Sequence, residues 1–138
     1  MEAAARPQAV LDTHILIWWR ADPSQLSPAQ RQYLESVETS GGRFTISAIT
    51  LWEIAKLVEH RQLTIHRPLD LFLNEIEEHP RIDVIALNGR ILAESVQLGN
   101  NFHRDPADQM ITATARCLGF PLVTQDGRIR AWGGVSVV

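Results

Sequence analysis

Short apolar segments alternate with helical segments along the whole chain, and this alternation is the feature that most constrains its fold. Strand-like segments are expected at residues 8–11, 43–47, 82–87, 121–124 and 135–138. Helical patterns separate them, at residues 13–20, 27–40, 48–60, from 69 to the His79-Pro80 stop, from Asn88 to about 99, and from Asp105 to Gly119. Strands joined by helices pair in parallel, and helices then cover both faces of the sheet. The sequence therefore predicts an α/β fold of three α/β/α layers, with a short, mostly parallel central sheet flanked by helices.

Length and composition indicate one ordinary globular domain. The 138 residues include 45% hydrophobic and 21% charged ones, enough for a core, and we expect a single domain over 1–138 with a flexible leader at 1–8. The longest apolar run, 15–19, is too short to span a bilayer. The single cysteine cannot form an internal disulfide, so we expect a cytoplasmic protein with no membrane partner.

Four carboxylates stand where strands end or helices begin: Asp12, Glu53, Asp108 and Asp126. In open α/β sheets, ligands bind beyond the carboxyl ends of the strands, so these acids are candidates for one site. Two unit charges about 4 Å apart repel by roughly 4 kcal/mol at an effective dielectric of 20. Gathering all of them therefore calls for a compensating cation, and hard divalent cations prefer oxygen ligands.

Each acid also has a purely structural interpretation, and local sequence does not decide between the two. Asp12 is a good helix N-cap, and Asp126 before Gly127 is a common turn residue. Glu53 lies on the one polar stripe of an apolar helix, where it is spaced to pair with Lys56. Asp105 precedes Pro106 and fits an N-cap, which leaves Asp108 at the third helical position as the favoured site acid, although the reverse assignment stays open.

Several other chemistries are disfavoured by the sequence. The five histidines lack the spacing of a zinc site, and there is no Gly-x-Gly-x-x-Gly, Walker-type loop or Gly-x-Ser-x-Gly elbow. A phosphatase with Asp12 as its nucleophile would need a second Asp two residues on, where this chain has His14. The net charge of −3 argues against a generic nucleic-acid binder, although twelve of the thirteen basic residues are Arg, which suits phosphate recognition.

Motifs spread over nearly the whole chain resemble the PIN-domain family, and within it the VapC-like toxin ribonucleases of toxin–antitoxin pairs. In the order of that family they are LDTH at 11–14, SAITLWEI at 47–54, HRDPAD at 103–108, ITATA at 111–115 and LVTQD at 122–126. The sequence departs from the pattern at Gln109, where relatives commonly carry Arg.

The resemblance implies a Mg2+- or Mn2+-dependent endoribonuclease whose catalytic and metal-binding acids are Asp12, Glu53, Asp108 and Asp126. Asp105, Thr13, Ser47 and Thr124 would support them, and Arg20, Lys56, His103, Arg104 and Arg128 are candidates for holding RNA, with tRNA or rRNA as the expected substrate. A cognate antitoxin and a homodimer are implied as partners. The alternative is a non-catalytic PIN-fold module that binds RNA or protein. The Trp18-Trp19 helix can serve either the core or a partner groove.

Overall fold

The structure is a computed structural model that describes residues 8–138. The expected leader at 1–8 lies outside the described residues except for Gln8, which begins the first strand; a single domain over the whole chain stays a prediction. The elements are β1 (Gln8–Leu11), α1 (Thr13–Ala21), the 3₁₀ turn η1 (Pro23–Gln25), α2 (Pro28–Thr39), β2 (Arg43–Ser47), α3 (Ala48–Glu59), α4 (Leu69–Glu77), β3 (Ile82–Ile85), α5 (Gly89–Val96), α6 (Pro106–Leu118), β4 (Leu122–Val123) and α7 (Gly127–Trp132).

The strands form one parallel sheet in the order β3-β2-β1-β4. From β1 the chain adds β2 and then β3 on one side, and it later returns to place β4 on the other side of β1. Val137 adds a parallel bridge beside Leu122, where a longer last strand was expected. The order of the strands therefore reverses between β1 and β4, which is the place where parallel sheets open a binding crevice.

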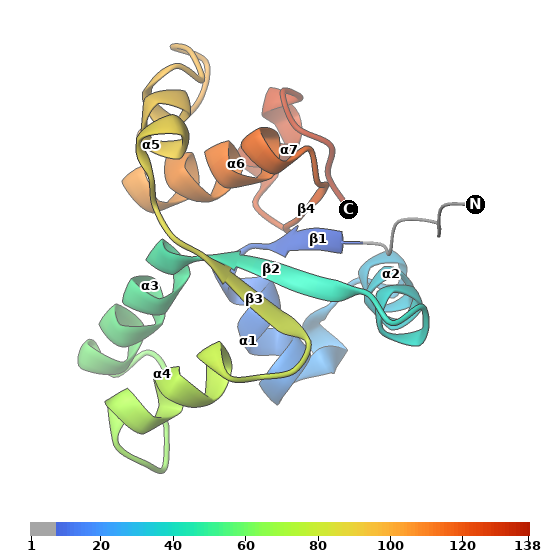
Figure 1. The fold of residues 1–138 in the computed structure, drawn as a ribbon, viewed down its shortest axis with the longest axis vertical. Helices are drawn as coiled ribbons and strands as arrows, with labels where there is room; N and C mark the ends of the chain where they lie inside the picture. The colour runs from blue at the N-terminus through green and yellow to red at the C-terminus, as the bar shows by residue number, and fades with distance from the viewer. Residues whose placement is uncertain (1–7) are drawn as a thin grey trace.

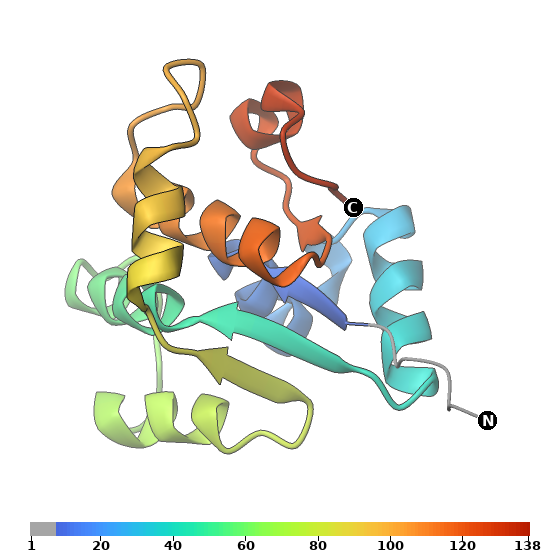
Figure 2. The same ribbon diagram turned by 45° about the horizontal axis from the view of Figure 1, so that its top comes forward.

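Helices cover both faces of this sheet (Figures 1 and 2). Alternate strand residues point to opposite faces, so Ala9 and Leu11 pack with α1 to α4, whereas Val10 packs with α6 and α7. α5 lies against α6 and completes the second layer. The prediction of three α/β/α layers with a parallel central sheet is confirmed.

Most helix ends follow the sequence signals, although α5 (Gly89–Val96) ends before the expected position near residue 99 and one helix was not expected at all. Ser27 and Gln30 form the capping box of α2, and Gly119 ends α6 in the left-handed conformation with φ of 69°. The unexpected helix is α7, because Asp126-Gly127 opens a helix where only a turn was expected. None of the helices described between residues 8 and 138 is long and apolar enough to cross a membrane.

The two adjacent tryptophans of α1 pack against the core. Trp19 meets Phe44 edge-on with the ring centroids 4.9 Å apart, and its Nε1 donates a hydrogen bond to Glu38. Trp18 also packs against this cluster and tilts over His14. The structure therefore favours the core interpretation of this pair.

Candidate functional site

Asp12 directly follows β1 and is almost fully buried, with 3% of its surface exposed. Its Oδ1 accepts a hydrogen bond of 2.8 Å from the Thr13 backbone N–H, as expected of the N-cap of α1. Its Oδ2 accepts a 2.7 Å hydrogen bond from the hydroxyl of Thr124. Capping and a place in the site are thus combined in one carboxylate, whose orientation is fixed from both sides.

Thr124 connects two of the acids at the end of β4. Besides donating to Asp12, its hydroxyl accepts a hydrogen bond of 3.0 Å from the backbone N–H of Asp126. Its own carbonyl accepts hydrogen bonds from the side chains of Gln30 and Arg130. Thr124 thus contacts both acids, so a shift of this residue would move both Asp12 and Asp126.

Glu53 faces the site from α3 and does not pair with Lys56. The Thr13 hydroxyl donates a 2.5 Å hydrogen bond to Glu53 Oε1, and Lys56 pairs with Glu59 at 3.0 Å. The pKa of Glu53 is raised from 4.5 to about 7, chiefly by burial; the Thr13 hydrogen bond opposes this rise, and the charges of nearby acids, Asp12 first, contribute to it. The solvated ion pair that local sequence suggested for Glu53 is absent among the described residues.

Asp105 and Asp108 both lie at the start of α6 but make different contacts. Asp105 is the N-cap of α6, and its Oδ1 accepts a hydrogen bond of 3.0 Å from the Asp108 backbone N–H. Asp108 turns toward the other acids, and its Oδ2 lies 2.6 Å from His103 Nε2. Burial raises the pKa of Asp108, with contributions from the Asp12 and Asp105 charges, while the His103 hydrogen bond lowers it.

Asp126 approaches from the opposite side of the site as the N-cap of α7. Its Oδ1 accepts hydrogen bonds from the backbone N–H groups of Arg128, at 2.8 Å, and Ile129, at 3.2 Å. The Arg128 guanidinium lies 3.1 Å from Asp126 Oδ2 and 3.6 Å from Asp108 Oδ2, between the two carboxylates. Burial raises the pKa of Asp126, but the hydrogen bonds from Arg128 and the helix N-terminus outweigh it, so the net pKa is lowered.

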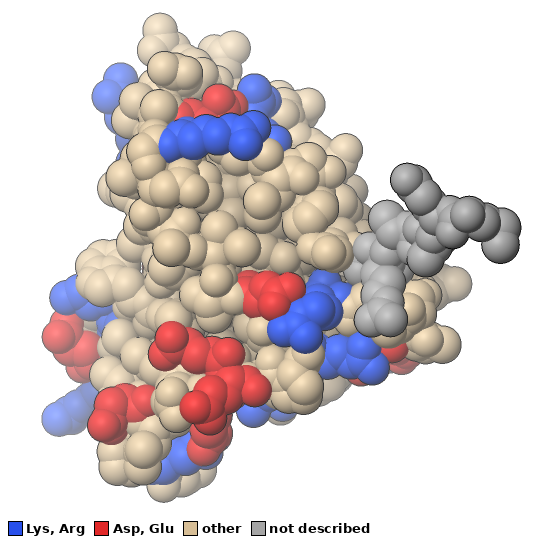
Figure 3. Space-filling view, viewed as in Figure 1, with Lys and Arg blue, Asp and Glu red and all other residues tan. Residues whose placement is uncertain are grey.

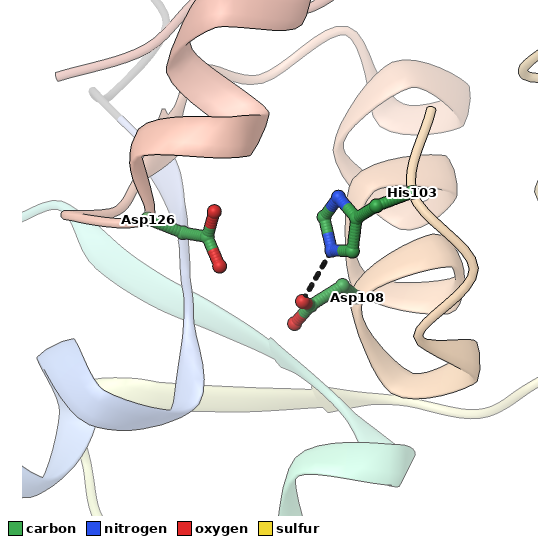
Figure 4. Close-up of side chains that lie close together, drawn as sticks. All are labelled: His103, Asp108 and Asp126. Carbon is green, nitrogen blue, oxygen red and sulfur yellow. Dashed lines mark hydrogen bonds and ion pairs between the residues drawn. The ribbon is translucent and has the colours of Figure 1, made fainter. Parts of the chain in front are cut away.

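His103, Asp108 and Asp126 form the tightest group at the site (Figure 4). One potential ligand atom from each lies within 4.8 Å of the others. Figure 4 shows the Asp126 carboxylate directed toward the gap on whose other side His103 and Asp108 are joined by their hydrogen bond. A cation placed in this gap would reach groups from α6, from the N-terminus of α7 and from the loop before α6.

The four predicted acids line one cleft of about 420 Å³, which runs between α1 and α3. Lys56 borders the same cleft, whereas His103, Arg104 and Arg128 line a neighbouring hollow. Arg20 borders a different hollow, between α1 and α4, so the structure does not bring it to the acids. The Ser47 hydroxyl caps α3 by accepting a hydrogen bond from the Ile49 N–H, so Ser47 supports the helix that carries Glu53 rather than an acid directly.

Sequence reasoning assigned no place in the site to two further residues, His14 and Thr50. His14 Nε2 accepts a hydrogen bond of 2.9 Å from the Gln125 backbone N–H, which leaves the other ring nitrogen, Nδ1, as the donor. That nitrogen lies 3.7 Å from Asp12 Oδ2. The Thr50 hydroxyl lies 3.2 Å from that of Thr13. Their positions in the sequence could have indicated both residues, because His14 directly follows Thr13 and Thr50 lies three residues before Glu53, on the same face of the helix.

The donor set of the cleft suits a hard divalent cation. Its acids offer oxygen ligands, and two of them, Glu53 and Asp108, carry raised pKa values because burial and neighbouring negative charges oppose their ionisation. A bound cation would reverse both effects. Hard ions such as Mg2+ prefer such oxygen ligands and keep some of their waters, for which the open cleft leaves room.

The fold and the site together define a class of protein: an α/β domain with a parallel sheet and with acids clustered where the order of the strands reverses. The chain belongs to the PIN domain family, whose model matches residues 9–134. It is 34% identical over 122 residues to Ribonuclease VapC22 from Mycobacterium tuberculosis (strain ATCC 25618 / H37Rv). The matched residues cover 88% of this chain and 89% of that protein.

Solved structures show the same fold at lower sequence identity. VapBC2 from Rickettsia felis, bound to a DNA fragment from its promoter, matches with a TM-score of 0.68 and 14% identity, over 95% of this chain and 97% of that one. DNA-bound VapBC from Salmonella typhimurium matches with a TM-score of 0.64 and 22% identity, over 96% of this chain and 97% of that one. Both cover nearly complete chains, so the likeness concerns the entire fold.

Proposed function

We propose that this chain is a metal-dependent endoribonuclease, the toxin component of a toxin–antitoxin pair, which hydrolyses phosphodiester bonds in RNA. The observation that carries the proposal is the convergence of Asp12, Glu53, Asp108 and Asp126 on one cleft. The relative that shares 34% of its residues is named a ribonuclease, which agrees with this chemistry. The acids are far apart in sequence, and a fold without a cation to bind would gain nothing from bringing them together.

Mg2+ or Mn2+ is the proposed cofactor, held by Asp12, Asp108 and Asp126 with Glu53 at the edge of the group. When bound, such an ion lowers the pKa of a coordinated water and offsets the charge that develops on the phosphate. The protein's own part is orientation: Thr13 and Thr124 fix the carboxylate of Asp12, and His103 fixes that of Asp108.

Glu53 is the best candidate for moving a proton. Without the ion its pKa is about 7, and a bound cation would lower that pKa and so favour the ionised carboxylate that a general base needs. Thr13 holds Oε1, which leaves Oε2 to accept a proton from an attacking water. Arg128, which lies between Asp108 and Asp126, can leave that position for a substrate phosphate when a cation enters.

Basic groups close to the cleft would hold the RNA backbone, since the molecule has no broad basic surface on the face shown in Figure 3. There, acidic side chains gather over the region of α4, whose sequence includes Asp70, Glu75 and Glu77, and the basic side chains lie in separate places. Lys56 on one side, and His103, Arg104 and Arg128 on the other, are the proposed contacts. We expect tRNA or rRNA as the substrate, and action in the cytoplasm, where these RNAs are found.

An antitoxin protein and a second copy of the chain are the proposed partners. The solved structures with this fold include VapBC complexes bound to DNA, one of them to its promoter, which supports an antitoxin partner for the present chain. The homodimer rests on the family resemblance.

Incubation of the purified chain with total tRNA and with ribosomal RNA, in Mg2+, Mn2+ or EDTA, tests the proposal. Discrete fragments that require the metal and disappear with EDTA are expected, and the fragment ends identify the substrate. If neither RNA is cut in any metal, the chain is the non-catalytic binding module considered as the alternative.

A further inference from the structure

Trp52 is a tryptophan that the fold leaves open to solvent, with 54% of its surface exposed. It lies on α3 immediately before Glu53 and lines the same cleft as the four acids. The other tryptophans of the described residues, Trp18, Trp19 and Trp132, pack against the two core clusters. An indole exposed beside a candidate active site, and not in the core, is placed where it can meet a ligand.

The surroundings of Trp52 combine an aromatic face with positive charge. Lys56, one turn further along α3, has its ammonium 5.7 Å from the centroid of the Trp52 ring. Lys56 also pairs with the exposed Glu59 at 3.0 Å, an interaction that solvent screens and a phosphate can replace. The cleft continues along α3 past Leu57 to His60, a distance of about 10 Å from Glu53 at 1.5 Å per residue.

We propose that Trp52 is a stacking platform for an unpaired nucleobase of the RNA, and that Lys56 contacts the phosphate that adjoins this base. The inference rests on the proposed ribonuclease function and names the class of its substrate, single-stranded RNA. A base can lie flat on an indole only after leaving its own helical stack, so a loop or a single strand is bound and a continuous duplex is not. Every base has a π-face, so this contact adds affinity without sequence preference.

The aliphatic side chains exposed elsewhere do not share these properties. Leu71 on α4, and Leu92 and Val96 on α5, are exposed but do not line the acid cleft. A second copy of the chain is the rival occupant for the Trp52 face. Lys56 and the continuous opening toward the acids favour a polyanion there, because an apolar interface would bury the ammonium next to the ring.

Binding of a labelled single-stranded RNA and of an RNA duplex of equal length tests the proposal, with Asp12→Asn in every protein to prevent cutting. Trp52→Ala is expected to weaken binding of the single strand about tenfold, the loss typical of one stacked base, and to leave duplex binding unchanged. Trp52→Phe should restore most of the affinity. Val96→Ala, which shortens an apolar residue that is 78% exposed and lies away from the cleft, is the control and should have no effect.

Two readouts separate stacking from other roles of Trp52. Single-stranded RNA should quench the tryptophan fluorescence of the unaltered chain. This quenching should be lost in Trp52→Phe, although the variant still binds the RNA. Calorimetry without the Asp12 substitution should give the same Mn2+ affinity for Trp52→Ala as for the unaltered chain. Lys56→Met should weaken binding and reduce the slope of log affinity against log salt by about 0.7, the value for one phosphate contact on a single strand.

Equal affinity of Trp52→Ala and Val96→Ala for the single strand would overturn the proposal. So would a change in the sedimentation mass of Trp52→Ala in the absence of RNA, because Trp52 would then be a contact between copies. Failure of the function itself gives a different result: the chain carrying Asp12 would bind RNA and leave it uncut in every metal.

Discussion

Replacing Glu53 by Gln removes one negative charge from the acid cleft while keeping the size of the side chain. The hydrogen bond from Thr13 can persist, because the amide oxygen accepts it as the carboxylate does. The folded state raises the pKa of Glu53 to about 7, against 4.5 for the ordinary group, chiefly through burial. The metal-free folded chain therefore binds more protons at this residue than the unfolded chain does, over the range between these two values.

The sign of the effect follows from that difference. Where the folded state binds the extra proton, stability falls as pH rises, so the chain with Glu53 loses stability from about pH 4.5 to 7 and regains none above it. At about 1.36 kcal/mol for each tenfold change in proton affinity, the full loss is about 3 kcal/mol. Solvent reaches this partly exposed carboxyl and screens it, which reduces the expected loss to about 1–2 kcal/mol.

Denaturant unfolding with EDTA at pH 5 and at pH 8 measures this loss. The Gln variant should match the unaltered chain at pH 5 and exceed it by about 1–2 kcal/mol at pH 8, or about 3–8 °C in Tm for a domain of this size. Glu35→Gln, at an exposed position of α2, is the control for loss of a carboxylate elsewhere. Equal gains at both pH values, or a less stable variant at pH 8, would refute the assignment of Glu53 to a cluster of mutually repelling acids. RNA cleavage by the variant should fall at all pH values.

Four further substitutions test the other acids and their support. Asp105→Ala should lower the free energy of unfolding by about 1 kcal/mol, because it removes the N-cap of α6, and should retain RNA cleavage. Asp108→Asn should retain stability and lose cleavage. The opposite pattern would reverse the roles of the two acids. Thr124→Val should weaken Mn2+ binding about 10- to 100-fold in calorimetry, because Asp12 and Asp126 both lose a hydrogen-bond partner, and an unchanged affinity would contradict this. Asp12→Asn should abolish cleavage with the metal-free fold at least as stable; a clear loss of stability by denaturant unfolding would make Asp12 a structural residue.

Local sequence was sufficient for most elements of the fold. The strand at 43–47 and the capping box of α2 appear as predicted, because their signals lie within a few neighbouring residues. The strand expected at 82–87 ends earlier, at Ile85. Helix α7 was missed because its only signal, Asp126-Gly127, is shared by turns and helix starts; whether the chain continues as a helix depends on Ile129, which is fully buried beneath it.

The candidate site depends on contacts that sequence spacing does not contain. Glu53 and Lys56 stand at a favourable spacing for a surface pair, yet Glu53 turns to Thr13, which is 40 residues away in the chain. Family resemblance placed Glu53 among the candidate acids where local reasoning favoured a surface pair, and Glu53 lines the cleft. His103 was expected to contact RNA, and its hydrogen bond to Asp108 became visible only when the loop before α6 was placed. Long-range packing decides both cases.

The acids of the cleft belong to different layers of the molecule. Asp12 and Glu53 come from α1 and α3 on one face of the sheet, and Asp108 and Asp126 come from α6 and α7 on the other. An ion bound by both pairs would act as a cross-link between the two half-cores that pack on opposite faces of the four-stranded sheet. Its binding energy would then oppose any partial opening that separates the layers, so amides far from the cleft would exchange more slowly when the ion is bound. Binding of an ion in the cleft would thus stabilise the whole domain against local opening.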